Sequence, residues 1–211
     1  MRWNKTNRLV KWLFPNYIWT IPNQQNKIYL TFDDGPTPEI TDWVLNELKK
    51  YNVKVTFFCI GDNVKKYPTI FEDLIKQGHS IGNHSFNHLD GFKTPTNLYL
   101  QNIELCEKEF QKKSNFISDN KIFRPPFGKI TPFQSHKLRS LDYKIIMWDV
   151  ISYDFDQNFS KENCLKKVLN NTTSGSIIVF HDSVKAFENL QYVLPKALEL
   201  FSKKGFVFEN I

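Results

Sequence analysis

Residues 28–36 read IYLTFDDGP, an apolar, strand-like run that ends in two adjacent carboxylates and a Gly-Pro turn. Two carboxylates held this close repel each other unless a cation or a metal ion lies beside them. Asp33 and Asp34 therefore indicate a metal site, a proton-transfer site or both. The alternative is ordinary turn chemistry, in which Asp33 caps the turn.

The composition predicts one globular domain. The chain has 211 residues, of which 41% are hydrophobic and 24% charged, as in soluble globular proteins. Its net charge of +6 comes from scattered lysines, and no motif for nucleic acid accompanies it, so we expect no nucleic-acid partner. The spacing of Cys59, Cys106 and Cys164 indicates free thiols rather than a disulfide framework.

The basic N-terminus lacks the apolar region of a cleaved signal, and no apolar run reaches the ~20 residues of a transmembrane helix. We therefore expect a cytoplasmic protein. Residues 1–26 form an extension in which apolar residues recur at helical spacing. It either packs back on the domain through Phe14, Pro15 and Trp19, or lies on a membrane surface through residues 1–19. The apolar stripe consists of Trp3, Val10, Leu13, Phe14 and Tyr17.

From residue 27 onward, strand patterns alternate with helical ones, which predicts a parallel sheet. The length suits an incomplete barrel. The predicted fold class is α/β, a single-domain, distorted (β/α) barrel of about seven parallel strands over residues 27–211. The expected strands are 28–32, 53–60, 79–83, 122–123, 144–150, 176–180 and 206–208. The expected helices are 38–51, 61–77, 98–110, 132–141, 161–169 and 186–203, with a polar connection over 111–121.

A second polar cluster, NHSFNH at 83–88, carries His84 and His88 four residues apart. This spacing is typical of metal ligands on one side of a turn or helix. Together with Asp34 they form a two-histidine, one-carboxylate set that leaves coordination positions open. Such a set suits zinc or another divalent transition metal.

Three further clusters follow predicted strands: RPPFG at 124–128, WDVISYDF at 148–155, and IVFHD at 178–182. Two prolines stiffen the first, and Gly128 permits close approach of a ligand. All five clusters thus lie at the carboxyl ends of strands. Because sites of parallel α/β folds assemble at that edge, we expect the clusters to meet there.

The motifs TFDDGP (31–36), HSFNH (84–88) and RPPFG (124–128), with TFFCIG (56–61) in support, occur in the order found in one family. Over residues 27–211 the chain resembles the polysaccharide deacetylases with the NodB-homology domain, carbohydrate esterase family 4. The resemblance implies a metal-dependent hydrolase that removes N-acetyl groups from a peptidoglycan-like or chitin-like glycan.

The resemblance also implies residue roles. Asp33 would be the general base, oriented by Arg124. Asp34, His84 and His88 would bind one divalent metal ion, with zinc expected first and cobalt, nickel or manganese as alternatives.

His181 would be the general acid, held by an acid of the cluster at 148–155. Family members often read Asp-x-x-Asp-Trp there, whereas this chain has Ile151 and Phe155 at the first and last positions. Asp154 therefore inherits the orienting role, and Asp149 is the alternative.

The backbone N–H of Phe127 would donate to the oxyanion, and Pro125, Phe155 and Val179 would line the substrate site. Three other functions use similar groups: an O-acetyl esterase or other C–N hydrolase, a non-haem iron oxygenase, and a non-catalytic, metal-stabilised sugar-binding module.

Overall fold

Strand β1 (Lys27–Asp33) lies inside a parallel sheet, between β2 and β7, in a computed structural model that describes residues 5–114 and 120–211. The strand order is β5-β4-β3-β2-β1-β7-β6, and β8 pairs with the start of β1. The other strands are β2 (Thr56–Cys59), β3 (Ser80–Asn83), β4 (Ile122–Phe123), β5 (Lys144–Ile145), β6 (Val150–Ile151), β7 (Ile177–His181) and β8 (Val207–Phe208).

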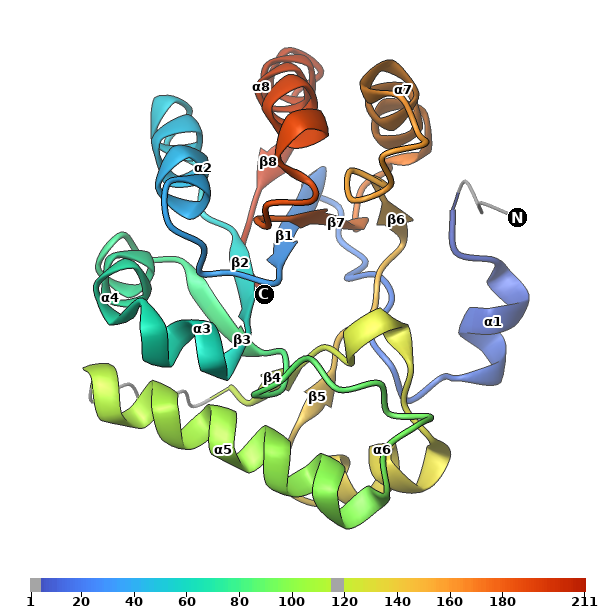
Figure 1. Cartoon of the computed structure of the whole chain (residues 1–211). Helices are drawn as coiled ribbons and strands as arrows, with labels where there is room; N and C mark the ends of the chain where they lie inside the picture. Colours follow the sequence, from blue (N-terminus) through green and yellow to red (C-terminus); the bar gives the residue numbers. More distant parts are fainter. Residues whose placement is uncertain (1–4, 115–119) are drawn as a thin grey trace.

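The sheet curls into an open half-barrel with helices around its outside (Figure 1). The predicted incomplete barrel of about seven parallel strands is therefore confirmed. Within the described residues, no helix has the length and apolar character needed to cross a membrane. The helices are α1 (Arg8–Leu13), α2 (Ile40–Lys50), α3 (Gly61–Lys66), α4 (Pro68–Lys76), α5 (Thr96–Ser114), α6 (Pro132–Arg139), α7 (Lys161–Asn171) and α8 (Phe187–Lys203).

The largest departures from the predicted elements lie at three places. The helix predicted over 61–77 is two helices, because Pro68 disfavours helical geometry at Tyr67, whose φ and ψ are −126° and 57°. The strand predicted over 144–150 is broken into β5 and β6. Helix α5 continues into the predicted polar connection over 111–121, and residues 115–119 of that connection lie outside the described residues.

Alternation along β1 decides which side chains enter the half-barrel. Ile28, Leu30 and Phe32 are fully buried in a core with residues of the outer helices. Thr31 and Asp33 point to the opposite face. In the register of β1 with β7, Asp33 lies directly beside His181. The strand pattern thus brings a carboxylate and an imidazole together at the carboxyl edge of the sheet.

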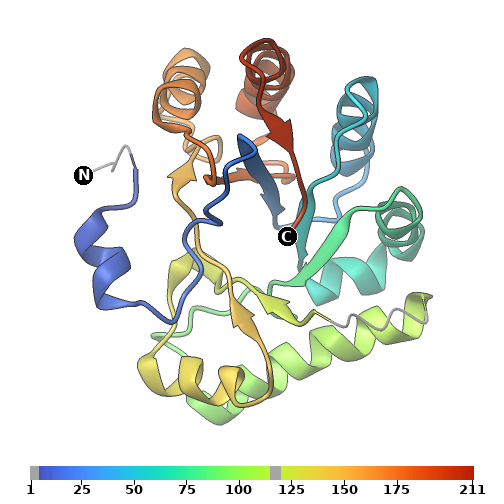
Figure 2. The ribbon, with the colours of Figure 1, turned by 180° about the vertical axis from the view of Figure 1, so that it is seen from behind.

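The N-terminal segment crosses the open side of the half-barrel before it enters β1 (Figure 2). Ile18 forms a parallel bridge with Ile146, and Thr20 an antiparallel bridge with Ser176. The indole of Trp19 is 8% exposed and donates to the carbonyl of Phe14. The segment therefore packs between the end of β5 and the start of β7. Of the predicted apolar stripe, only residues within 8–13 are helical, and Trp3 lies outside the described residues.

Candidate active site

Asp34, His84 and His88 come together at the carboxyl ends of β1 and β3. One ligand atom of each lies within 4.8 Å of the others, and Asp34 Oδ1 is 3.3 Å from His88 Nε2 and 3.7 Å from His84 Nε2. His84 Nδ1 lies 2.7 Å from the carbonyl oxygen of Arg124. Because a carbonyl can only accept, Nδ1 carries the proton and the lone pair of Nε2 faces Asp34.

The pKa shifts of His84 and Asp34 keep both side chains in the forms that bind a divalent cation. Burial lowers the pKa of His84 to about 4, so its imidazole is neutral at neutral pH. Burial also raises the pKa of Asp34, but the hydrogen bond from His88 and the charge of His181 outweigh it. The pKa of Asp34 stays well below its usual range. One carboxylate and two imidazoles are ligands that zinc and related ions accept.

Both loops that present the ligands adopt left-handed backbone conformations. The φ angles are 84° at Asp34, 63° at Ser85 and 55° at His88. Such angles cost a non-glycine residue on the order of 1 kcal/mol and gather at functional sites. The turns after β1 and β3 thus hold their side chains in place at an energetic cost.

Asp33 is paired with a fully buried arginine. Arg124 Nη1 lies 2.7 Å from Asp33 Oδ1 and 2.6 Å from the hydroxyl of Thr31. Its other nitrogens donate to the carbonyls of Ile146 and Met147. Burial lowers the pKa of Arg124, and the charge and hydrogen bond of Asp33 oppose that shift. The pair is therefore a buried ion pair whose donors are directed by backbone acceptors.

His181 faces Asp33 and is held by Asp154. His181 Nδ1 lies 2.8 Å from Asp154 Oδ1, and its backbone N–H donates to Oδ2 over 2.9 Å. Burial lowers the pKa of His181, but the charge and hydrogen bond of Asp154, with the charges of Asp34 and Asp33, raise it overall from 6.5 to about 9. His181 is therefore an imidazolium at neutral pH.

Asp149, the alternative partner for His181, lies elsewhere. Its buried carboxylate binds Lys5 over 2.9 Å, Lys11, and the hydroxyl of Ser176 over 2.6 Å. It thus anchors the N-terminal segment, and Asp154 is the acid that contacts His181.

Asp182 is a site residue that sequence reasoning missed. It is fully buried, and its carboxylate accepts from the N–H of Gly35 over 3.0 Å and from the hydroxyl of Thr41 over 2.6 Å. A Cβ at Gly35 would lie 2.0 Å from Asp182 Oδ2. Asp182 therefore holds the turn that carries Asp34. Only its place at the end of a buried strand marks it in the sequence.

These groups open into a cavity of about 640 Å³. Each predicted site residue lines it except Arg124 and Asp154, which lie behind Asp33 and His181. Phe127, whose φ is 59°, places its ring edge-on against His88 at a centroid distance of 4.5 Å. Gly128, expected from the sequence to permit close approach of a ligand, also lines it. Residues that sequence reasoning did not assign complete the lining: Trp148, Ile151, Ser183, Val184 and Lys185.

Comparisons with known proteins agree with this geometry. Residues 20–146 match the polysaccharide deacetylase family. A peptidoglycan-N-acetylglucosamine deacetylase of Bacillus cereus is 32% identical over 194 residues, which cover 92% of this chain and 90% of that protein. A chitooligosaccharide deacetylase of Azorhizobium caulinodans is 31% identical and covers 77% and 76% of the two chains.

Among solved structures, the Bc1960 peptidoglycan N-acetylglucosamine deacetylase, in complex with a benzamide compound, superposes with a TM-score of 0.88. It is 30% identical, and the match covers 96% of this chain and 94% of that one. The fold, the ordered motifs and these similarities agree: the chain belongs to the polysaccharide deacetylase family, carbohydrate esterase family 4, with its NodB-homology domain.

Proposed function

We propose that this chain is a metal-dependent hydrolase that removes N-acetyl groups from an amino-sugar polymer or oligomer, with peptidoglycan-like and chitin-like glycans as candidates. One observation carries the proposal. The adjacent acids have separate partners in one cavity: Asp34 faces two histidines, and Asp33 is paired with Arg124. Across from them, His181 carries a proton. Amide hydrolysis needs both a proton acceptor and a proton donor.

Asp34, His84 and His88 would hold one divalent ion, zinc in the first place and cobalt, nickel or manganese as alternatives. The fixed tautomer of His84, which turns Nε2 toward Asp34, supports this assignment. Such an ion, when bound, polarises a carbonyl and lowers the pKa of water from ~15.7 toward about 7.

The other residues would handle the protons. Asp33, oriented by its ion pair with Arg124, would take a proton from the attacking water as the water oxygen bonds to the acetyl carbon. His181, protonated and oriented by Asp154, would give a proton to the amine nitrogen as the C–N bond breaks. The products are acetate and a free amino sugar.

The substrate would lie against the remaining lining residues. The backbone N–H of Phe127 would donate to the oxyanion, because Phe127 lines the cavity and its ring packs against that of His88. Pro125, Phe155 and Val179 would form the apolar wall, with the ring of Phe155 4.8 Å from that of His181.

Acetate release across a panel of N-acetylated and O-acetylated glycans tests the function, together with metal analysis of the same samples. We expect acetate from an N-acetylated amino sugar and about one ion per chain. His84→Ala should lose both. Release from O-acetyl esters alone, or undiminished release by His84→Ala, would contradict the proposal.

The membrane contact stays a proposal for residues 1–19, of which the structure describes 5–19. In α1, Leu9, Trp12 and Leu13 are 60%, 73% and 56% exposed, beside the basic Arg8, a pattern that suits an anionic membrane surface. In a flotation assay with anionic liposomes, the wild type should float with the liposomes and Trp12→Ser should not. Equal flotation of the two proteins would contradict the membrane contact. The cytoplasmic location likewise stays a prediction, for which cell fractionation is the test.

A further inference from the structure

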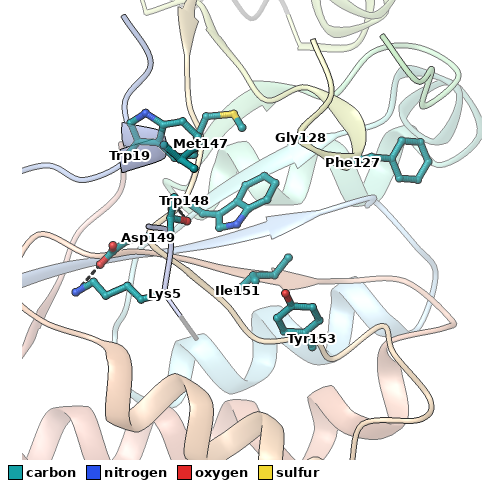
Figure 3. Close-up of a pocket in the computed structure, with 11 residues that line it drawn as sticks. Lys5, Trp19, Phe127, Gly128, Met147, Trp148, Asp149, Ile151 and Tyr153 are labelled. Atoms are coloured by element: carbon teal, nitrogen blue, oxygen red, sulfur yellow. Dashed lines mark hydrogen bonds and ion pairs between the residues drawn. The ribbon is translucent and has the colours of Figure 1, made fainter. Parts of the chain in front are cut away.

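A hollow of about 460 Å³ lies between the N-terminal segment and the loop before β7. We call it the basic hollow, because its charged lining residues are Lys5, Arg8, Lys11 and Asp149. Among the described residues, none lines both the basic hollow and the active-site cavity. In Figure 3, Lys5 and Asp149 lie on the other side of the Trp148 indole from Phe127. The basic hollow is therefore a separate site, which the roles proposed for the catalytic residues do not use.

The basic hollow carries an excess of positive charge. Asp149 is fully buried, and its Oδ2 lies 2.9 Å from Lys5 Nζ while its Oδ1 binds Lys11. Arg8 is exposed, and it has no ion pair within residues 5–114 and 120–211. Because Asp149 is the only acid among the described lining residues, three positive charges face one negative charge, an excess of two. Cations this close together repel one another, so an anion that binds between them is favoured.

The cations of the basic hollow also have unused N–H donors. Within the described residues, the Lys5 ammonium donates to Asp149 and, over 2.9 Å, to the hydroxyl of Thr173. The Lys11 ammonium donates to Asp149 alone. An ammonium has three N–H groups, so one remains on Lys5 and two on Lys11. These side chains are 36% and 22% exposed, so a ligand can reach them. Phosphate oxygens are strong acceptors for lysine and arginine.

Helix α1 places an apolar face next to this basic site. It lies at the edge of the fold, apart from the other helices (Figures 1 and 2). Arg8 and Lys11 are three residues apart on the side of α1 that lines the basic hollow. Leu9, Trp12 and Leu13 lie on another side and are 60%, 73% and 56% exposed. A ligand that suits both faces has an anionic phosphate next to apolar chains, as a phospholipid does.

We propose that the basic hollow binds the phosphate of an anionic phospholipid headgroup while the apolar face of α1 enters the membrane surface. The inference rests on the membrane contact proposed above, to which it adds a binding site and a lipid class. It does not depend on the deacetylation chemistry. A zwitterionic lipid suits the site less, because the ammonium of its own headgroup neutralises the phosphate and would approach the cations of the hollow.

The test measures binding of the full chain to two kinds of vesicle, phosphatidylcholine alone and phosphatidylcholine mixed with phosphatidylglycerol, by flotation across a lipid titration. Arg8→Gln removes one positive charge from the basic hollow, and Arg8→Lys keeps it. Lys49→Gln is the matched control, because it removes the same charge from an exposed position of α2 outside the hollow. Calorimetry with glycerol phosphate measures whether a phosphate in free solution binds instead.

We expect the wild type to bind the mixed vesicles more tightly than phosphatidylcholine alone. Arg8→Gln should weaken that binding about fivefold, the effect expected of one basic residue at an anionic surface. Arg8→Lys and Lys49→Gln should stay close to the wild type. Equal binding by the wild type and Arg8→Gln, or an equal loss in Lys49→Gln, would overturn the inference. Saturable binding of glycerol phosphate without a preference for the mixed vesicles would overturn it as well.

Trp12→Ser separates this inference from the membrane contact on which it rests. If Trp12→Ser weakens vesicle binding and Arg8→Gln does not, the membrane contact stands and the phosphate site is wrong. A wild type that binds neither kind of vesicle would contradict the membrane contact and, with it, the phosphate site. In either case acetate release would be unaffected, because neither Arg8 nor Trp12 lines the active-site cavity.

Discussion

Asp154→Asn should show how much of the effect of Asp154 on His181 comes from its negative charge, because asparagine has nearly the same shape without the charge. Asparagine keeps an oxygen near His181 Nδ1, now 2.8 Å from Asp154 Oδ1, but removes the negative charge. In the native protein that charge and hydrogen bond are the largest contributions that raise the pKa of His181, which reaches about 9 against 6.5 for a free histidine. Their loss should move the pKa back toward 6.5.

The difference corresponds to about 3 kcal/mol of stabilisation of the imidazolium. At pH 7.5, roughly 97% of His181 is protonated with a pKa of 9 and roughly 10% with a pKa of 6.5. If His181 is the general acid, the alkaline limb of the pH profile of kcat/KM should move to lower pH in Asp154→Asn.

The pH profile of acetate release and an NMR titration of the His181 ring measure the two quantities. Asp149→Asn is the matched control, because it removes a buried carboxylate that binds Lys5 and Lys11 instead. It should leave the pKa of His181 where it is. An unchanged alkaline limb in Asp154→Asn, or an equal shift in Asp149→Asn, would refute the assignment of Asp154 as the partner.

Two further changes test the framework of the site. Burial lowers the pKa of His79, whose Nδ1 accepts from the N–H of Val55, to about 4. As the pH falls, His79 is therefore protonated in the unfolded chain before it is protonated in the folded one, and up to about 3 kcal/mol of the free energy of unfolding should be lost between pH 6.5 and 4. Urea unfolding should show that this free energy depends less on pH in His79→Asn than in the wild type. An equal dependence in the two proteins would refute the role of His79. Gly35→Ala places a Cβ against the carboxylate of Asp182. The change should lower the free energy of unfolding by about 1–3 kcal/mol and weaken metal binding at Asp34. An unchanged metal affinity would contradict the positioning role of Asp182.

The sequence predicts the parts of the site that depend on strand ends. Alternation in β1 places Asp33 on the inner face, and parallel pairing places it beside His181. Both follow from period-two geometry, in which the carboxyl ends of parallel strands share one edge. The family motifs bring Asp34, His84 and His88 together for the same reason, and the structure places them within 4.8 Å.

The choice of Asp154 over Asp149 came from the family resemblance and could not be made from the strand pattern. Strand β6 has only two residues, Val150 and Ile151. The alternation of side chains along a strand therefore does not predict which way either acid points. Their positions depend on partners distant in the chain, Lys5 for one and His181 for the other.

The same limit applies to Asp182 and to the N-terminal segment. Asp182 accepts a hydrogen bond from Thr41, 141 positions earlier in the chain, and the hydroxyl of Thr6 in the N-terminal segment donates to the carbonyl of Trp148. Contacts of this range come from tertiary packing, which local propensity and hydrophobic pattern do not encode.

The central claim is that Asp34 binds a metal ion while its neighbour Asp33 accepts the proton. Asp33→Asn tests this division directly, with metal content and acetate release measured on the same preparation. We expect about one divalent ion per chain, as in the wild type, and a fall in kcat of at least about a hundredfold. Turnover near the wild-type rate would contradict Asp33 as the base, and loss of the ion would contradict the separation of roles.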